Sequence, residues 1–454
     1  MQQRILLLPH AILLTIGILF WPTPLYATSE ADAAFRELAS EISEVSHLYY
    51  QEAAHELKNT HYIKRSLRDL KRTVTQLIEA EEHALANAVI LANFSLIKKN
   101  IDHKSMPFFL AQLLEHNIWQ GAQSLVDTAL ARGSLATKSE VNYLLGEYYF
   151  THDDLAQAIK HLTAIESSRP LSQDERDYAT LIFGIALQKE KKHRQALKIY
   201  QKIKTGSSYF GHSRLNMAIA HIRQEWWTDA QIAIDEALEV TPPKGQEEIN
   251  NRLLLVLGYS QLQNEFYRNA RETFRKISLN SDYMNRALHG IGLCAISQKD
   301  YLGAINAFSR LRNSDSNELV VLESHLLIPY TYNRVGDLDK AALGYSEAIA
   351  FYENITREMN ARRLLLNASN SAEINAQAVA SLPPYMQENY RMLTNLNAQQ
   401  SSPAIQAKIK SAKDKLHRII TKTLIVNLDE TSKHVKSYLS QSQYGLAKLY
   451  DTPQ

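Results

Sequence analysis

The sequence predicts an all-α protein, built as a solenoid of stacked helix-turn-helix repeats. Between about Asn142 and Pro242 one pattern occurs three times: a small residue, an Ala twelve positions later and an apolar residue four positions after that. The copies are Gly146–Ala158–Leu162, Gly184–Ala196–Tyr200 and Ala218–Ala230–Ile234. Small residues let two helix backbones approach closely, and the bulky residue fills the space above them. A unit this small cannot bury its apolar face alone, so the units must stack.

The second-helix Ala extends the pattern to seven copies. These marker alanines are Ala122, Ala158, Ala196, Ala230, Ala270, Ala304 and Ala341, separated by 34 to 40 residues. The shortest separation sets the period, and we expect the extra residues in turns between repeats, such as Ser168–Glu175 and Pro242–Glu248.

At this point the chain resembles the tetratricopeptide repeat (TPR) family. The matching residues are Leu145-Gly146 with Tyr149, Ala158 and Pro170; Leu257-Gly258 with Ala270 and Phe274; and Gly292 with Ala304 and Phe308. The family's early Trp is missing, and Pro329 replaces the small residue of the last unit. The resemblance covers roughly Met106 to Tyr352. It implies a right-handed TPR-type α-solenoid of about six to seven repeats that binds other proteins.

Residues 1–27 are predicted to be a signal peptide. Arg4 precedes an apolar run, Ile5–Phe20, and the segment ends in the small residue Ala27. The alternative is an inner-membrane anchor over residues 5–21, although the run contains Pro9 and is shorter than the roughly 20 residues that span a bilayer. We therefore expect an exported, periplasmic protein, or one anchored to the inner membrane and facing the periplasm.

Residues 28–105 are predicted to form a helical cap, with a degenerate repeat in His83–Asn100. Ala33–Leu57 has an apolar stripe at Phe35, Leu38, Ile42, Val45 and Tyr49, which indicates one amphipathic helix. It caps the first repeat or pairs with another helix, and capping is favoured because a solenoid end needs a cover. Lys58–Arg72 is rich in Lys and Arg; we interpret it as a solvated helix face above Ile63, Leu67, Leu70, Val74 and Leu77, the alternative being a binding patch.

Residues 106–352 are predicted to be the solenoid and residues 353–454 a C-terminal helical module. The last repeat continues into a long helix to about Leu366, and Tyr385–Leu396 follows Pro383-Pro384. Ile405, Ile409, Ala412, Leu416 and Ile419 are spaced like a coiled-coil seam, and the apolar stripe continues towards the C-terminus. The run is longer than an ordinary helix, so we expect a break in it. The module folds back, docks on the solenoid or forms a homo-oligomer through residues 404–454.

Charge and cysteine content narrow the function classes. A net charge of +2 over 454 residues argues against nucleic-acid binding, since such domains carry a marked basic excess. Cys294 is the single cysteine, so no internal disulfide can form, which favours a bacterial envelope compartment for an exported protein. We interpret Cys294 as a small core residue.

No catalytic motif is recognised. Gly290-Ile291-Gly292 lies inside a predicted helix and indicates close helix packing rather than a phosphate loop. His152-Asp153-Asp154 lies in a turn where Asp is the expected N-cap, and no His pair has metal-ligand spacing beside an acidic residue. We predict a non-enzymatic protein without cofactor or metal.

The first helices of such a solenoid line a concave groove, where we predict the binding site for a partner. The positions in that phase are Tyr143, Glu147, Phe150, Tyr178, Lys189, His212, Arg223, Arg252, Tyr259, Gln263, Arg286, His289, Tyr330, Asn333 and Arg334. The row of Lys189, Arg223, Arg252, Arg286 and Arg334 would bind carboxylates, with tyrosines as apolar anchors. The alternative for these residues is a solvated inner face. Some TPR proteins clamp a C-terminal carboxylate with a Lys and Asn pattern, which this sequence does not reproduce.

The predicted function is a scaffold of the cell envelope that binds a protein segment in this groove. Two alternatives remain: a ligand-binding or enzymatic module in Asn367–Gln454 that the solenoid presents, and a structural subunit that oligomerises through its C-terminal helix.

Overall fold

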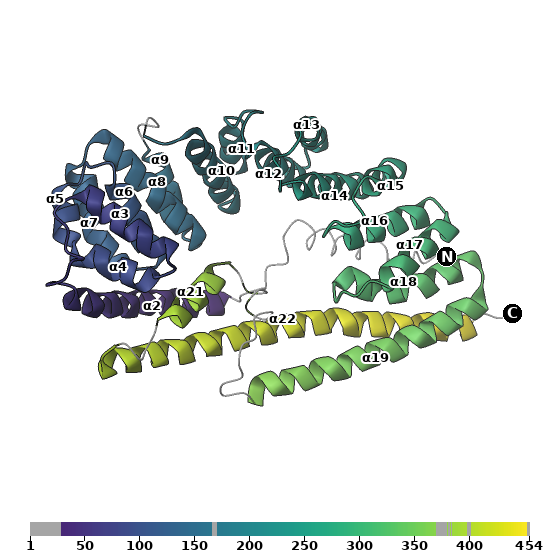
Figure 1. Cartoon of the computed structure of the whole chain (residues 1–454). Helices are drawn as coiled ribbons and strands as arrows, with labels where there is room; N and C mark the ends of the chain where they lie inside the picture. The colour runs from purple at the N-terminus through teal and green to yellow at the C-terminus, as the bar shows by residue number, and fades with distance from the viewer. Residues whose placement is uncertain are drawn as a thin grey trace. The chain divides into compact units, whose positions relative to one another are not determined.

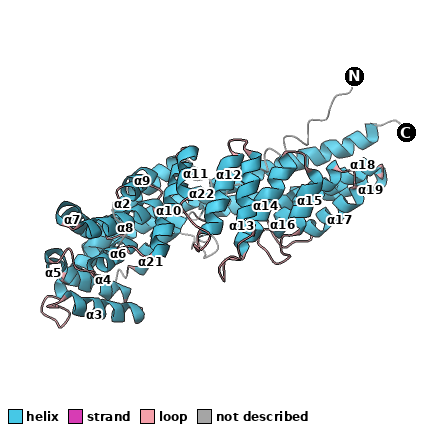
Figure 2. Cartoon of the chain, turned by 90° about the horizontal axis from the view of Figure 1, so that it is seen from above, coloured by secondary structure: helices cyan, strands magenta, loops and turns pink. Residues whose placement is uncertain are grey.

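The computed structural model describes residues 29–165, 170–368, 379, 382, 384–396 and 401–451. All regular structure in these ranges is α-helical, joined by short loops (Figure 2). The all-α prediction is therefore confirmed. The predicted signal segment, residues 1–27, lies outside the described residues.

The chain divides into two compact units. We call Leu25–Lys202 with Ser371–Leu424 the N-terminal unit, and Ile203–Asn370 with Ile425–Gln454 the C-terminal unit. Each unit therefore combines consecutive repeats with a segment from the end of the chain. Residues 353–454, predicted as a separate module, contribute to both units.

The repeats are antiparallel helix pairs that follow one another along the chain (Figure 1). After α2 (Ser29–Glu56), the N-terminal unit contains α3 (Leu67–Glu79), α4 (His83–Ala92), α5 (Phe94–Lys99), α6 (Met106–Glu115), α7 (Trp119–Arg132), α8 (Leu135–Thr151), α9 (Leu155–Thr163), α10 (Gln173–Lys189) and α11 (His193–Tyr200). The C-terminal unit contains α12 (Phe210–Ile222), α13 (Trp227–Leu238), α14 (Glu248–Gln263), α15 (Tyr267–Arg275), α16 (Met284–Ser297), α17 (Tyr301–Arg312), α18 (Leu319–Val335) and α19 (Leu338–Ala368). They are followed by α21 (Pro384–Asn395) and α22 (Pro403–Asp451).

The marker alanines share one structural position. Each is the fourth residue of the second helix of its pair, from Ala122 in α7 to Ala341 in α19, and each is at most 1% exposed. Ala86 occupies the same position in α4 and is 1% exposed, so α3 and α4 form one more pair. The degenerate repeat expected at His83–Asn100 thus begins earlier, with α3 as its first helix.

The turn inside each pair is also repeated. The residue two positions before each second helix is left-handed: Glu81, Asn117, Asp153, Lys191, Glu225, Glu265 and Lys299 with φ of 52 to 63°, and Gly336 with φ of 89°. The next N–H then donates to a carbonyl five residues earlier, as from Phe266 to Gln261 at 2.9 Å. This is the hydrogen bond of a Schellman cap, which Gly usually supports. Seven of these described turns form without glycine, and of these the sequence indicated only the one at His152-Asp153-Asp154, where Asp154 is the N-cap of α9.

The predicted contact between small and bulky residues is present. A Cβ on Gly146, Gly184, Gly258 or Gly292 would lie 2.3 to 2.6 Å from the side chain sixteen residues later, at Leu162, Tyr200, Phe274 or Phe308. Gly290 faces Phe274 from the next first helix, with its added Cβ 2.4 Å from the ring. The Gly290-Ile291-Gly292 stretch is therefore a packing element, as predicted.

The first half of α22 belongs to the N-terminal unit and packs on α2. Ile405, Ile409, Ala412 and Leu416 are buried in one cluster with Phe35, Leu38, Ile42, Val45 and Tyr49 of α2. Lys408 pairs with Glu44 at 2.7 Å and Lys415 with Glu41 at 2.6 Å, so the two helices are antiparallel. Ile420 continues the seam at 0% exposure, whereas the predicted Ile419 is only partly buried. α2 therefore pairs with another helix, one of the two predicted roles, and it also packs on α4 and α7 of the first helix pairs, in agreement with the favoured capping role.

The second half of α22 belongs to the C-terminal unit and lies beside α19 (Figure 1). Val435 is buried with Tyr345 and Tyr352 of α19, and a Cβ on Gly445 would lie 2.5 Å from the Tyr345 ring. Arg363 and Asp429, 3.5 Å apart, extend the contact. Contrary to expectation, α22 has no break over its 49 residues.

The helix in the basic stretch Lys58–Arg72 begins after Ile63, which the sequence predicted to lie in the apolar stripe of that helix. Ser66 caps α3 by accepting from the Asp69 N–H, so the helix starts at Leu67. Ile63 precedes the cap and is 41% exposed, outside the buried stripe of Leu67, Leu70 and Val74.

Candidate functional site

Three of the fifteen predicted groove residues lie in the interior of the repeats. Tyr143, Tyr259 and His289 are 8%, 2% and 1% exposed. From their positions on the first helix these side chains point towards the neighbouring helix pair, which covers them. These three side chains are corrected from groove surface to core.

Tyr259 and His289 belong to a row of buried polar side chains that extends across α14, α16 and α18. The Tyr259 hydroxyl donates to the Arg286 carbonyl at 2.8 Å and lies 3.3 Å from His289 Nδ1. Burial raises the pKa of Tyr259 well above its usual value, so the hydroxyl keeps its proton. His289 Nε2 is 3.2 Å from Glu323 Oε2, but its direction does not make a hydrogen bond. The hydrogen bonds of Tyr259 link α14 to α16, and the contact of His289 with Glu323 continues to α18.

Two members of the predicted basic row are neutralised within the chain. Arg286 Nε pairs with Glu318 at 3.3 Å, and the same carboxylate accepts from Asn285. Lys189 pairs with Asp153 at 2.8 Å. The sequence placed Asp153 in a turn but predicted neither Asp153 nor Glu318 as an ion-pair partner, because an acidic residue in a turn gives no sign of which helix it faces.

Arg252 is the strongest remaining candidate in the row. It lies half-buried on α14, and among the described residues no carboxylate forms an ion pair with it. Burial first, and then the charge of Arg252, lower the pKa of His212 on α12, which places the two side chains near each other. A half-buried guanidinium beside a neutral imidazole favours an anionic ligand.

The other predicted positions of the C-terminal unit reach solvent. Arg223, Gln263 and Arg334 are exposed, and Tyr330 and Asn333 are partly buried. Arg334 lies near Tyr330, where burial raises the pKa of the phenol and the arginine charge opposes that change. These residues provide polar and aromatic groups on α14 and α18 and at the end of α12.

The N-terminal unit has a different character. Glu147 is partly buried on α8; burial and the nearby Glu175 raise its pKa, and a hydrogen bond from Tyr143 lowers it. Lys189 Nζ lies 5.8 Å from the centre of the Phe150 ring. Tyr178 on α10 is partly buried. The predicted residues of this unit therefore combine aromatic rings with acidic groups, and their lysine is paired.

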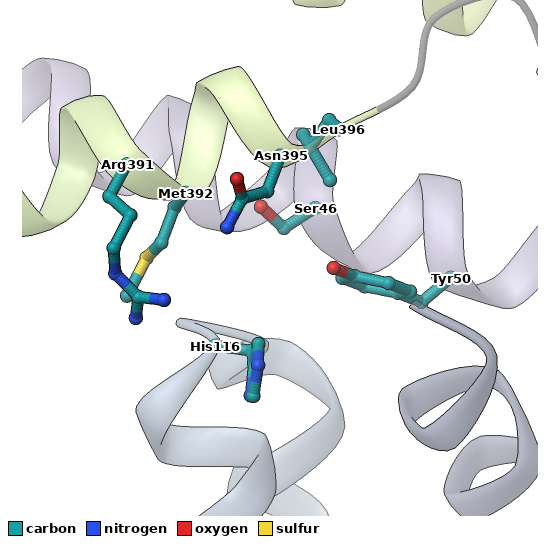
Figure 3. Close-up of a pocket in the computed structure, with 7 residues that line it drawn as sticks. All are labelled: Ser46, Tyr50, His116, Arg391, Met392, Asn395 and Leu396. Carbon is teal, nitrogen blue, oxygen red and sulfur yellow. The ribbon is translucent and has the colours of Figure 1, made fainter. Parts of the chain in front are cut away.

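One small pocket lies between α2, α6 and α21, within the N-terminal unit (Figure 3). Ser46, Tyr50, His116, Arg391, Met392, Asn395 and Leu396 line it. Its cavity volume is about 10 Å³, room for roughly one water molecule, whereas small-molecule sites span hundreds of Å³. The pocket is therefore not a ligand site of ordinary size.

The described ranges hold no candidate metal centre and no candidate membrane span. No group of three or more His, Cys, Asp or Glu residues in them is arranged to hold a metal ion. None of the helices in these ranges combines the length and apolar character needed to span a bilayer.

Comparison with known proteins identifies the repeats. The tetratricopeptide repeat family model matches residues 255–318, which contain the pairs marked by Ala270 and Ala304. No curated protein matches the chain.

Three solved structures resemble the chain at low identity. The APC/C hetero-tetramer Cut9–Hcn1 is 15% identical, with 76% of this chain and 73% of that chain covered and a TM-score of 0.29. The TPR domain of P58(IPK) is 13% identical, with 85% and 99% covered and a TM-score of 0.21. A circular tandem repeat protein is 13% identical, with 92% and 98% covered and a TM-score of 0.15.

Proposed function

We propose that this chain, whose residues 255–318 match the tetratricopeptide repeat model, is a non-enzymatic scaffold that binds a segment of a protein partner on its first helices. The observation that best supports this proposal is the environment of Arg252. Its side chain is half-buried near His212 and forms no ion pair among the described residues. In each described repeat, the helix faces that point inward carry packing residues. Specificity for a partner must therefore come from the first-helix side chains that reach solvent. Arg223 follows α12, the first helix before α14, and Arg334 lies on α18, two first helices after it; both are exposed.

The proposed ligand is an acidic segment, extended or helical. Carboxylates would pair with the exposed guanidiniums, and Tyr330 would contact apolar groups. Arg286 is excluded as a direct contact because Glu318 already holds it. The proposed site therefore lies within the C-terminal unit.

The test is a pair of charge reversals, Arg252→Glu with Arg334→Glu. They should abolish co-purification of the partner from the native host while helical content is retained. Arg268→Glu is the control: Arg268 is 85% exposed in the first turn of a second helix, and the change removes only its exposed ion pair with Glu272. A photo-crosslinking residue at position 252 should capture the same partner, and one at position 268 should not. Equal capture by the double variant would contradict the proposal.

The location proposed is the bacterial cell envelope, with export directed by residues 1–27. Support comes from the apolar run behind Arg4 and from the single cysteine. Fractionation of the native host and the mass of the mature N-terminus would test this. A cytoplasmic protein that retains Met1 would exclude it, and a membrane-bound protein that retains residues 5–21 would favour the anchored alternative.

A homo-oligomer through residues 404–454 is a separate proposal. The chain itself covers Ile409, Leu416 and Val435 of α22, so an oligomer would use the side chains left exposed. The largest apolar ones are Tyr444 and Tyr450, at 61% and 78% exposure. Light scattering of the wild type and of Tyr444→Ser with Tyr450→Ser would test it, because an oligomer held by this face should dissociate in the variant.

A further inference from the structure

α21 is seated in the N-terminal unit by one face. Met386, Asn389, Leu393 and Leu396 are 0 to 3% exposed, at spacings of three, four and three residues. Thr394, on the opposite side, is exposed. An amphipathic helix with such anchors is the usual ligand of a groove that binds helices. Here the ligand is part of the same chain.

The groove that holds α21 is built without α21. Asn117, the left-handed residue of the α6–α7 turn, accepts from the Tyr148 hydroxyl at 2.8 Å. The Trp119 ring stacks on Tyr148 with centroids 5.4 Å apart, and the Trp119 N–H donates to Ser43 of α2. These contacts join α2, α7 and α8 to one another. The groove would therefore keep its form if α21 left.

The fit between α21 and this groove is incomplete. The Asn117 amide reaches Asn389 Oδ1 at 3.4 Å, at the long limit of a hydrogen bond. The pocket of Figure 3 lies between the helix and its groove, and Ser46 Oγ beside it is buried with no hydrogen-bond partner among the described residues. A buried hydroxyl without a partner is unfavourable. The Ser46 hydroxyl is thus an unfavourable element of this contact.

We propose that α21 is a displaceable internal ligand, and that this groove binds an amphipathic helix of a protein partner once α21 has left. The partner helix would carry Met or Leu at the positions of Met386, Leu393 and Leu396, and an amide at the position of Asn389. Twelve residues are too few for a stable isolated helix in water, so displaced α21 would lose its helical hydrogen bonds. Release and unfolding of α21 are therefore one event, which makes it measurable. None of the groove residues belongs to the Arg252 site.

The first experiment uses the unaltered chain. An isotope-labelled synthetic peptide of residues 384–396 is added while hydrogen exchange of the chain's own α21 amides is followed by mass spectrometry. A tethered segment acts at an effective concentration of about 1 mM, so half-displacement should require peptide of that order. Exchange of α21 should then accelerate at least about tenfold, with α8 unchanged. Unchanged α21 exchange at several times that concentration would overturn the proposal.

The second experiment opens the groove by substitution. Met386→Asp with Leu393→Asp places carboxylates on the buried face of α21, whereas the control Thr394→Ala changes the exposed face. The double variant should bind fluorescent 384–396 peptide at a concentration at least about tenfold lower than the wild type requires, and Thr394→Ala should match the wild type. Circular dichroism establishes that the repeats stay folded. Equal binding by all three proteins would overturn the proposal, and if the double variant unfolds the first experiment decides.

Discussion

The two halves of α22 are held in different ways. In the N-terminal unit its first half forms a continuous apolar seam with α2, flanked by the pairs Lys408–Glu44 and Lys415–Glu41. In the C-terminal unit its second half, as far as it is described, has Val435 as its buried apolar residue, and its other apolar contacts are partly exposed. One helix therefore has a coiled-coil-like interface at one end and a sparser one at the other.

The sparser interface repeats the packing of the solenoid. Tyr345 stands four residues after the marker Ala341, as Phe274 stands four after Ala270. Gly445 faces Tyr345 as Gly290 faces Phe274. The second half of α22 thus takes the place of a next first helix and covers the last repeat. A solenoid end can be covered by a helix from a distant part of the sequence if a small residue meets the bulky one.

The largest expected loss of stability distinguishes the α2–α22 interface from the α19–α22 interface. Ile409→Ala should destabilise the N-terminal unit by about 3 kcal/mol, because it leaves a cavity in a fully buried seam. Val435→Ala should cost about 1 kcal/mol, since it removes less volume from a thinner interface. The free energies come from hydrogen exchange of α2 amides for the first variant and α18 amides for the second. Equal losses would mean that the interfaces are alike.

The next largest loss of stability is expected from replacing the two glycines that face aromatic rings, Gly445 and Gly258. Gly445→Ala and Gly258→Ala each direct a Cβ to 2.5 Å from an aromatic ring, so both should cost about 2 kcal/mol by overpacking. Thermal denaturation of the two variants tests the equivalence. Gly206→Ala is the control, because open space surrounds that position. A neutral Gly445→Ala beside a costly Gly258→Ala would show that α22 does not replace a repeat helix.

A pH effect of about the same size is expected at the last repeat. His325 stacks on Phe351 at 3.7 Å, and burial, assisted by the charge of Arg312, lowers its pKa to about 4. The unfolded chain takes up the proton near pH 6.5, so this stability is present above pH 6.5 and is lost as the pH falls below it. After allowance for solvent screening the loss is about 2 kcal/mol.

The variant His325→Phe isolates this contribution. Urea titrations at pH 7.5 and pH 5 should show a smaller fall in stability for the variant than for the wild type. In the N-terminal unit, burial lowers the pKa of His116, His152 and His161, so that unit should keep its own acid sensitivity in the variant. An unchanged fall at the last repeat would exclude His325 as its source.

The smallest effect concerns the turns that all repeats share. Glu265→Gly should stabilise the C-terminal unit by up to about 1 kcal/mol, since glycine adopts φ of 63° without steric strain. Gly336→Ala should destabilise it by a similar amount. Melting temperatures of the two variants should move in opposite directions, and movement in the same direction would contradict the shared turn.

The sequence located the repeats because their packing requires specific residue sizes. The marker Ala and the bulky residue four positions later are fixed by the distance between two helices, so the phase could be read as far as Ala341. The pair α3–α4 was recognised only in part: its second helix lies in the expected degenerate repeat, but the series of marker alanines was followed only as far back as Ala122 and did not include Ala86. The turn is defined by backbone hydrogen bonds, which leave little mark on residue type.

The candidate site was predictable only as a set of positions. Helical phase placed Tyr259, His289 and Arg252 on first helices, but exposure depends on what the neighbouring repeat brings against each side chain. Arg286 and Lys189 were predicted as ligands for carboxylates, and the structure supplies those carboxylates from Glu318 and Asp153.

By itself the sequence determined the class of fold, the period of the repeats and the amphipathic character of α2 and α22, because these depend on spacings within one helix or one pair. Only the tertiary structure decided which helix each half of α22 joins, that α21 lies in a groove of the N-terminal unit, and that Glu318 and Asp153 pair with two members of the basic row. An apolar stripe in the sequence indicates that one face of the helix must be buried, but any other apolar helix face of similar width can bury it. The choice is made by contacts between residues hundreds of positions apart, such as Glu41 with Lys415, and no local spacing records it.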